Sequence, residues 1–207
     1  MARRHTLPPS PSGAAQAADR RPRFWRWLWR SSALAALIGA AWLCSRPFTP
    51  AFRSDAALGE GFWHYSNGRY EQAVQAFGEA LTQDPLNAAA HLNRGDAYAA
   101  LGQWEAALAD YDAVIALYPE YPWAYASRGE AYLVLGRAGQ ALADFDTVIA
   151  LKPDYALAYY DRASTYDLLG DAARTSADYA RFLELYDLPD ARADYARERL
   201  QELASAR

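Results

Sequence analysis

The sequence predicts an all-α protein: a solenoid of about four helix pairs that ends in a C-terminal capping helix and is preceded by one transmembrane helix. The first observation is a pattern that recurs every 34 residues, in which Tyr98 returns as Tyr132 and Tyr166. A fixed period of this size is typical of solenoids. The second is that apolar residues within each period lie three and four residues apart, as on one face of a helix. The third is an uncharged run before the repeats, residues 31–44.

Charge is divided unevenly along the chain. Residues 1–53 hold nine arginines and one aspartate, whereas the remainder holds twelve lysines and arginines against 24 aspartates and glutamates. A nucleic-acid-binding protein would carry its positive charge on the folded part, so this division argues against that class. Because 52% of the residues are hydrophobic, the chain as a whole is not disordered. The single cysteine, Cys44, excludes an intramolecular disulfide and a zinc site built from cysteines.

The N-terminal region is interpreted as an arm followed by a membrane anchor. Residues 1–23 lack hydrophobic periodicity and contain several prolines, which predicts a disordered basic arm. Residues 24–45 are interpreted as a transmembrane signal-anchor helix. The uncharged run alone covers about 21 Å as a helix, short of a hydrocarbon core of roughly 30 Å. Counting from Trp27 extends it to about 27 Å, and Arg30 can then snorkel to the headgroups.

Arginines crowd the N-terminal side of this predicted helix, and such positive charge is retained in the cytoplasm. We therefore expect a cytoplasmic N-terminus and an extracytoplasmic C-terminal body, in the inner (plasma) membrane of a bacterium, as the arginine- and alanine-rich composition suggests. Residues 46–54, with two prolines, would form a short stiff linker. Three alternatives stay open: cleavage as a signal peptide near Gly39 and Ala41, a lipid anchor on Cys44, and a twin-arginine signal at Arg20-Arg21.

The repeats predict four helix pairs. In the second unit the first helix ends at Gly102, since glycine suits a helix C-terminus, and the second helix runs from Trp104 until Pro119 stops it. The pairs are expected over residues 55–83, 88–117, 122–151 and 156–186, within units 55–85, 88–119, 122–153 and 156–187 of a solenoid domain 55–187. Residues 188–207 are expected to hold an amphipathic capping helix, residues 191–204, and a tail.

Aromatic, Leu-Gly, Tyr, Ala, Phe/Tyr, Ala and Pro positions follow one another at this period. Over about residues 55–187 the chain thereby resembles the tetratricopeptide repeat proteins, of a membrane-anchored bacterial type. The resemblance implies a right-handed α-solenoid whose concave groove, lined by the first helix of each unit, binds other proteins. The chain departs from the family pattern at Ala57, Glu60, Thr175 and Asp187, in the terminal units that must meet solvent or a cap.

Three arginines stand where that family usually has an apolar residue: Arg94, Arg128 and Arg162. Each is followed sixteen residues later by an aspartate: Asp110, Asp144 and Asp178. In the first unit the corresponding places hold Glu60 and Ala76, so both members are missing together. This joint loss predicts an ion pair between the two helices of each of the last three units. The alternative is that the charges are independent and solvated.

No catalytic motif stands out. The sequence contains no glycine-rich phosphate-binding loop and no Gly-x-Ser-x-Gly. His64 and His91 fall in aromatic core columns and are interpreted as core residues rather than ligands or bases. Asp110 and Asp112 lie two residues apart, so they do not share a helical face and make a poor acid–base pair. We therefore expect no enzyme, no metal site and no cofactor.

The predicted groove combines aromatic rings with polar and acidic groups. Its residues are, unit by unit, Phe62 and Tyr65; Asn93 and Asp96; Trp123, Ser127 and Glu130; and Tyr160 and Asp161. Exposed rings among carboxylates suit a peptide or helix with basic and apolar side chains. The alternative is that Trp123 and Tyr160 pack against neighbouring units or the cap. Family members that clamp a C-terminal carboxylate use cations on this surface, where this chain has Leu58, Leu92, Ala126 and Tyr160.

The expected function is that of a non-catalytic scaffold or adaptor, anchored in the membrane, which binds a partner protein in its groove and does not bind nucleic acid. The alternative is a structural subunit that self-assembles in an envelope complex through stacking of solenoid ends.

Overall fold

The computed structural model describes the backbone of residues 50–205 and the side chains from residue 54 on. This part of the chain is helical, as the sequence predicts. The helices are α2 (Pro50–Ser66), α3 (Tyr70–Gln83), α4 (Ala88–Ala100), α5 (Trp104–Leu117), α6 (Pro122–Val134), α7 (Ala138–Leu151), α8 (Ala156–Leu168), α9 (Ala172–Leu185) and α10 (Ala191–Ser205). No helix among these residues is long and apolar enough to cross a bilayer. The predicted transmembrane helix and the predicted disordered arm lie outside the described residues.

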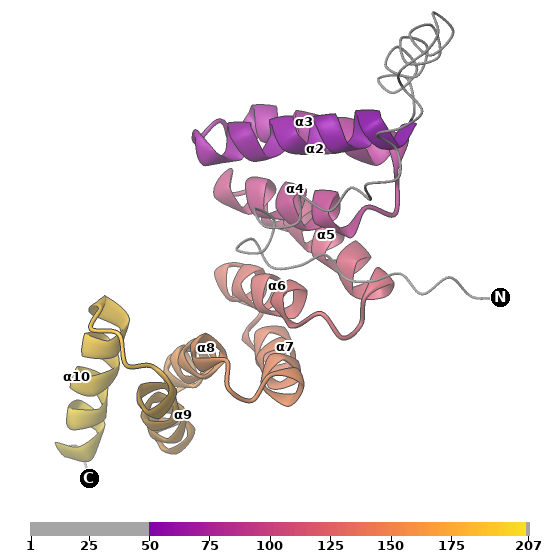
Figure 1. Cartoon of the computed structure of the whole chain (residues 1–207). Helices are drawn as coiled ribbons and strands as arrows, with labels where there is room; N and C mark the ends of the chain where they lie inside the picture. The colour runs from indigo at the N-terminus through magenta and orange to yellow at the C-terminus, as the bar shows by residue number, and fades with distance from the viewer. Residues whose placement is uncertain (1–49, 206–207) are drawn as a thin grey trace, which may run out of the picture. The chain divides into compact units, whose positions relative to one another are not determined.

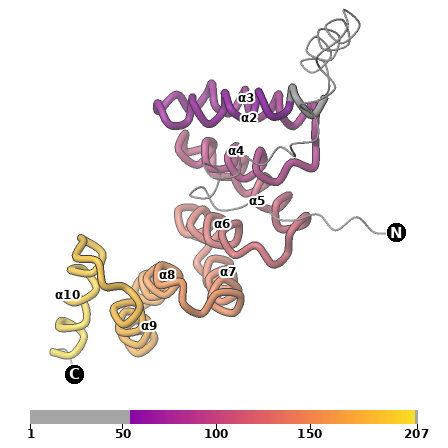
Figure 2. Tube along the Cα trace, viewed as in Figure 1, coloured from indigo at the N-terminus to yellow at the C-terminus, as the bar shows by residue number. Residues whose placement is uncertain are grey.

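Helices α2 to α9 form four successive pairs, and each pair packs on the next (Figure 1). The second helix of one pair contacts the first helix of the following pair: α3 with α4, α5 with α6, and α7 with α8. First helices also touch one another, α2 with α4, α4 with α6, and α6 with α8. Helix α10 then packs on α9 (Figure 2). The first helices therefore form a continuous row, as expected for the inner side of a solenoid.

The two helices of each pair are joined by a glycine turn. Gly68, Gly102, Gly136 and Gly170 have φ angles of 70° to 75°, a left-handed conformation that other L-residues adopt at a cost. In the second unit Gln103 N donates to the Tyr98 carbonyl at 2.8 Å and Gly102 N to the Ala99 carbonyl at 2.9 Å. These bonds satisfy carbonyls at the end of α4 and turn the chain towards α5.

Within each pair a small residue faces a large ring. Gly95 lies against Tyr111 and Gly129 against Phe145, and a Cβ built on either glycine would come within 2.7 Å of the ring. The rings of Phe77, Tyr111, Phe145 and Tyr179 are all buried. Because these glycines have no side chain at the point where the ring packs, the two helices of a pair can approach closely and leave no space between them.

The predicted linker, residues 46–54, needs a correction. Helix α2 begins at Pro50, so residues 50–54 belong to the first helix pair. Proline is well suited to the first position of a helix because its fixed φ fits and its missing N–H would be unpaired there. Ser54 is buried, and its hydroxyl donates to the Ala80 carbonyl at 3.4 Å. Within the described residues the linker is therefore replaced by helix, and the first unit starts five residues earlier than expected.

Candidate functional site

The structure brings each predicted arginine and aspartate together in two parallel hydrogen bonds. Arg94 donates to Asp110 from Nε and Nη2, both at 2.8 Å. The same two nitrogens of Arg128 reach Asp144 at 2.9 and 2.7 Å, and those of Arg162 reach Asp178 at 2.7 and 2.8 Å. All three aspartates are buried. This two-pronged geometry is the strongest form of arginine–carboxylate contact, and it ties the two helices of each unit together.

A second carboxylate extends two of these pairs to the neighbouring unit. Arg128 Nη1 donates to Asp112 of α5 at 2.6 Å, and Arg162 Nη1 donates to Asp146 of α7 at 2.6 Å. These bonds were not expected from the sequence, although Asp112 and Asp146 recur one period apart. In the first unit that position is Gly78, which contributes no carboxylate to Arg94. The arginines therefore join helices within a unit and units to each other.

His91 belongs to the same polar column. Its Nδ1 lies 2.7 Å from Asp110 Oδ1 and its Nε2 lies 3.1 Å from the Pro85 carbonyl. In the next two units the hydroxyls of Tyr125 and Tyr159 donate to the equivalent proline carbonyls, each at 3.1 Å. Both ring nitrogens of His91 are thus engaged in structural contacts.

Four of the predicted groove residues meet in one surface hollow: Tyr65, Asp96, Ser127 and Glu130. They come from the first helices of three successive units, α2, α4 and α6. The hollow is completed by Ala99, Ala100, Trp104 and Tyr111. Residues that lie more than 30 positions apart in the sequence therefore share one concave surface, with aromatic walls and two carboxylates.

The pKa values of the carboxylates in and beside this hollow are raised. Asp96 accepts a hydrogen bond from the buried hydroxyl of Tyr111 at 2.9 Å, and burial raises the pKa of Asp96. Glu130 lines the hollow with an exposed side chain, and its partial desolvation, followed by the charge of Asp96, raises its pKa. Burial and then the charge of Glu130 raise the pKa of Asp161 to about 7, while Arg192 of α10 opposes the shift.

The three carboxylates therefore form a row of negative charge across α4, α6 and α8. We call Asp96, Glu130 and Asp161 the acidic row. Burial raises the pKa values of these groups, and for Glu130 and Asp161 a neighbouring carboxylate raises them further, because both disfavour the ionised form. A cationic group brought to the row would favour the ionised form and would itself be stabilised.

Other predicted groove residues have partners of their own. Trp123 is exposed at the start of α6, where its ring lies 5.2 Å from that of Tyr121 and Lys152 Nζ stands 4.9 Å above it. Tyr160 is partly buried and packs on Tyr179 and Phe182, at centroid distances of 5.6 and 5.1 Å. The alternative expected for these rings was packing against neighbouring units or the cap. Tyr179 and Phe182 belong to the same unit as Tyr160, and the cluster that they form also includes Ala193 and Ala196 of the cap.

Phe62 and Asn93 complete the predicted set. The ring of Phe62 meets that of Phe77 edge-on at 5.6 Å and stays exposed. The side-chain amide of Asn93 donates to the Ala89 carbonyl of its own helix at 2.6 Å. Phe62 therefore keeps a free face, whereas the amide N–H₂ of Asn93 is partly committed to the helix.

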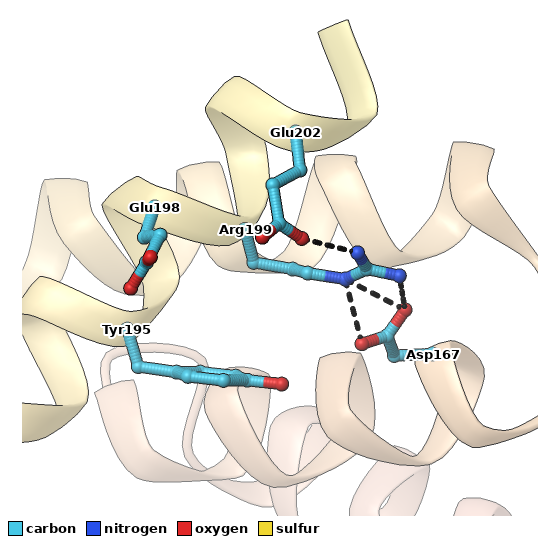
Figure 3. Close-up of a pocket in the computed structure, with 5 residues that line it drawn as sticks. All are labelled: Asp167, Tyr195, Glu198, Arg199 and Glu202. Carbon is cyan, nitrogen blue, oxygen red and sulfur yellow. Dashed lines mark hydrogen bonds and ion pairs between the residues drawn. The ribbon is translucent and has the colours of Figure 1, made fainter. Parts of the chain in front are cut away.

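A second hollow lies where α10 meets α8, and no sequence pattern predicted it. Arg199 of α10 donates to both carboxylate oxygens of Asp167 at 2.8 to 3.1 Å and to Glu202 at 2.5 Å, beside Tyr195 and Glu198 (Figure 3). These contacts fix the orientation of α10 on the last helix pair. The side chain of Arg199 is bonded to Asp167 and Glu202, so the residues around this hollow attach α10 to the last helix pair.

Among the described residues, no group of three histidine, cysteine, aspartate or glutamate side chains is arranged to hold a metal ion.

Comparison with known proteins places this geometry in a known architecture. Residues 64–122 match the family model of the tetratricopeptide repeat. A search of curated proteins finds no match. A thermophilic tetratricopeptide repeat protein of Thermus thermophilus, TTC0263, is 27% identical at a TM-score of 0.59, covering 74% of this chain and 82% of that one.

Two further solved structures are similar. The second tetratricopeptide repeat domain of human RPAP3, in complex with the HSP70 peptide SGPTIEEVD, is 29% identical at a TM-score of 0.54, over 56% of this chain and 97% of that one. The MamA protein is 21% identical at a TM-score of 0.64, over 74% of this chain and 87% of that one, and shows the fold alone. The tetratricopeptide repeat model thus matches residues 64–122, and the arrangement of the helix pairs as a whole is similar to that of solved tetratricopeptide repeat proteins.

Proposed function

We propose that this tetratricopeptide repeat protein is a non-catalytic adaptor that holds a segment of another protein in the hollow lined by α2, α4 and α6. Tetratricopeptide repeat domains generally mediate protein–protein interaction, and the RPAP3 domain named above was solved with a bound peptide. The observation that carries the proposal is the meeting of Tyr65, Asp96, Ser127 and Glu130 in one concave surface. Rings beside hydrogen-bonding groups are what the side chains and backbone of a bound peptide require.

The charge of the hollow selects the chemistry of the partner. The peptide bound by the RPAP3 domain, SGPTIEEVD, is acidic, whereas the acidic row here would repel such a peptide and attract lysine or arginine. The positions where a carboxylate clamp would need cations hold Leu58, Leu92, Ala126 and Tyr160. The partner segment is therefore an extended or helical peptide with basic and apolar side chains.

We further propose that residues 24–45 anchor the chain in the inner membrane of a bacterium, with the N-terminus in the cytoplasm and the repeats outside it. The support is the apolar run flanked by arginines on its N-terminal side. An adaptor anchored in this way would hold its partner close to the membrane.

The peptide-binding proposal is tested with the full chain in mild detergent and a library of random twelve-residue peptides. Selected peptides should be enriched in lysine or arginine next to aromatic or aliphatic residues. Glu130→Lys reverses a charge of the acidic row and should weaken binding of the selected peptides by roughly tenfold or more. Trp123→Ala should also weaken binding, because it removes an exposed ring from the first turn of α6.

The matched control is Glu120→Lys, which makes the same charge change in an exposed loop between α5 and α6. It should bind like the unchanged protein, and all variants should keep the same helical circular dichroism. Selection of acidic peptides, or equal binding by Glu130→Lys and Glu120→Lys, would show that the hollow is not the site.

A further inference from the structure

The hollow lined by α2, α4 and α6 carries negative charge without a cation of its own. Of the residues that line it, Asp96 and Glu130 are acidic and none is lysine or arginine. One oxygen of Asp96 accepts the Tyr111 hydroxyl at 2.9 Å. Within the described part of the chain, no ion pair reaches either carboxylate, and that of Glu130 accepts no hydrogen bond. The hollow therefore offers carboxylate oxygens that are open to a ligand.

Aromatic rings complete this arrangement. Tyr65 of α2 and Trp104 and Tyr111 of α5 line the same hollow, and Tyr65 is 37% exposed. Carboxylates accept the N–H groups of a guanidinium in pairs, and aromatic rings stack on its plane. Two carboxylates next to rings are therefore the surroundings that suit the side chain of an arginine.

The same combination holds an arginine elsewhere in this chain. Arg128 bonds to Asp144 and Asp112. Its guanidinium lies 5.4 and 5.8 Å from the rings of Tyr125 and Tyr132. The fourth unit repeats the arrangement with Arg162, Asp146, Asp178 and Tyr159. Each of these arginines is held by two carboxylates and at least one ring. The hollow has this composition and lacks the arginine.

We propose that the hollow receives one arginine side chain of the partner protein, with its guanidinium between Asp96 and Glu130 and its plane against an aromatic wall. One planar group then bridges carboxylates of two helices, α4 and α6, as Arg128 does within the solenoid. The ammonium of lysine has no plane to stack. It is also more strongly hydrated than a guanidinium, so its transfer into a partly enclosed hollow costs more.

The size and charge of the hollow agree with a single guanidinium. Its volume of about 220 Å³ is smaller than the roughly 300 to 1,000 Å³ of sites that enclose drug-sized molecules. The charge of Asp96 contributes, after burial, to the raised pKa of Glu130, so the two carboxylates lie near enough to repel each other. Arg192 of α10 also acts on Glu130, but it does not line the hollow, and its ion pair is with Asp190 at 3.7 Å.

The assignment rests on the proposed function, since it names the side chain that the partner places in the hollow. Peptide substitution tests it on the full chain in mild detergent. A twelve-residue peptide library with equal amounts of arginine and lysine should yield binders enriched in arginine over lysine. In a selected peptide, replacing this arginine by lysine should raise the dissociation constant at least about fivefold. Citrulline, which keeps the shape and removes the charge, should raise it at least about tenfold.

Variants of the protein locate the bound side chain. Glu130→Gln removes one of the two carboxylates and should reduce the preference for the arginine peptide over its citrulline form at least about threefold. Tyr65→Leu removes a ring and should reduce the preference for the arginine peptide over its lysine form. The control is Glu120→Gln, which removes a charge from the exposed loop between α5 and α6 and should change neither ratio. All variants should keep their helical circular dichroism.

The outcomes separate the arginine assignment from the proposed function. If arginine and lysine peptides bind equally and Glu130→Lys still abolishes binding, the assignment fails and the adaptor function stands. A library that yields no binders would overturn both. A preference for arginine that neither Glu130→Gln nor Tyr65→Leu changes would mean that the arginine binds elsewhere on the protein, and would overturn the assignment.

Discussion

At the scale of single residues, the three arginine–aspartate pairs stabilise each unit and also connect neighbouring units. We call these pairs, Arg94–Asp110, Arg128–Asp144 and Arg162–Asp178, the arginine–aspartate column. Each aspartate of the pairs is buried, and burial of a carboxylate is costly unless every oxygen is paired. The two-pronged arginine supplies those partners, and its remaining nitrogen reaches the preceding unit in two of the three cases. The side chains of Tyr125 and Tyr132 also lie beside the Arg128 guanidinium, at 5.4 and 5.8 Å. One arginine thereby determines the spacing of three helices.

Replacing Arg128 by methionine should destabilise the protein strongly. The change leaves Asp144 buried without a cationic partner, so the expected loss is about 3 kcal/mol in the free energy of unfolding. Urea unfolding followed by circular dichroism measures it. Arg137→Met is the control, because the contact of Arg137 with Glu105 is 3.7 Å long and exposed, and should change stability by less than about 0.5 kcal/mol. Equal stability of the two variants would contradict a structural role of the column.

A second prediction at this scale concerns the effect of Asp161 on the pH dependence of stability. Its pKa is raised to about 7 by burial and by Glu130, so its ionised form is disfavoured in the folded state. The resulting penalty is absent below the unfolded pKa, grows as the pH rises, and is complete above pH 7. Asp161→Asn removes the penalty. It should therefore raise the melting temperature at pH 8 and have a smaller effect at pH 5.

Thermal unfolding at the two pH values measures this difference. A gain in melting temperature that is the same at pH 5 and pH 8 would show that Asp161 titrates normally in the folded protein.

At the scale of helices, α2 contains two glycines with opposite roles. A Cβ added at Gly59 would meet nothing, whereas one added at Gly61 would overlap the ring of Phe77. Gly59→Ala should stabilise the protein by about 0.5 to 1 kcal/mol, since alanine loses less backbone entropy in a helix. Gly61→Ala should destabilise it by about 1 to 3 kcal/mol, because the ring of Phe77 must shift.

Chemical unfolding of both variants checks this contrast within one helix. Opposite signs are expected, and a gain in stability from Gly61→Ala would mean that α2 and α3 are less closely packed than described. In the capping helix α10, burial likewise depends on position. Ala193 and Ala196 are buried because they face α9, whereas Ala191 and Ala204 of the same helix are exposed.

At the scale of the whole molecule, the basic N-terminal region and the acidic repeats suggest two environments. We expect the full chain to stay in the membrane pellet after an alkaline carbonate wash, because the helix proposed for residues 24–45 would be held by the bilayer and not by surface charge. A chain that starts at residue 48, the beginning of the compact unit formed by residues 48–207, should be released.

Protease added from the extracytoplasmic side should digest the repeats of the full chain. The intact mass of the membrane-bound protein distinguishes an anchor from a cleaved signal peptide. Release of the full chain by carbonate would contradict the anchor.

The number of repeats and the ends of their helices could be predicted from the sequence. Proline and glycine recur every 34 residues and stop helices by local chemistry, which does not depend on distant parts of the chain. The exception is the start of α2, where Pro50 was placed in a linker although it opens a helix. The pairs Arg94–Asp110, Arg128–Asp144 and Arg162–Asp178 were also accessible, because both members lie within one unit of fixed geometry.

The residues of the groove could be predicted from the sequence only in part. Tyr65, Asp96, Ser127 and Glu130 share one hollow, but Tyr160 packs against the core cluster that includes Phe182 and the buried alanines of α10, and Trp123 lies beside Lys152. The surroundings of Tyr160 depend on how α10 docks, and the contact of Arg199 with Asp167 spans 32 residues without any repeated signal.

By itself, therefore, the sequence determined the period, the helix pairs and the ion pair within each unit, since these follow from contacts between residues close along the chain. The stacking of units decided which carboxylates meet in the acidic row, which arginine reaches a neighbouring unit, and why Trp63 is exposed while Ala97, Ala131 and Thr165, one to three periods later, are buried. Those outcomes depend on the offset between neighbouring helix pairs, which is set by packing of side chains that lie far apart in the sequence.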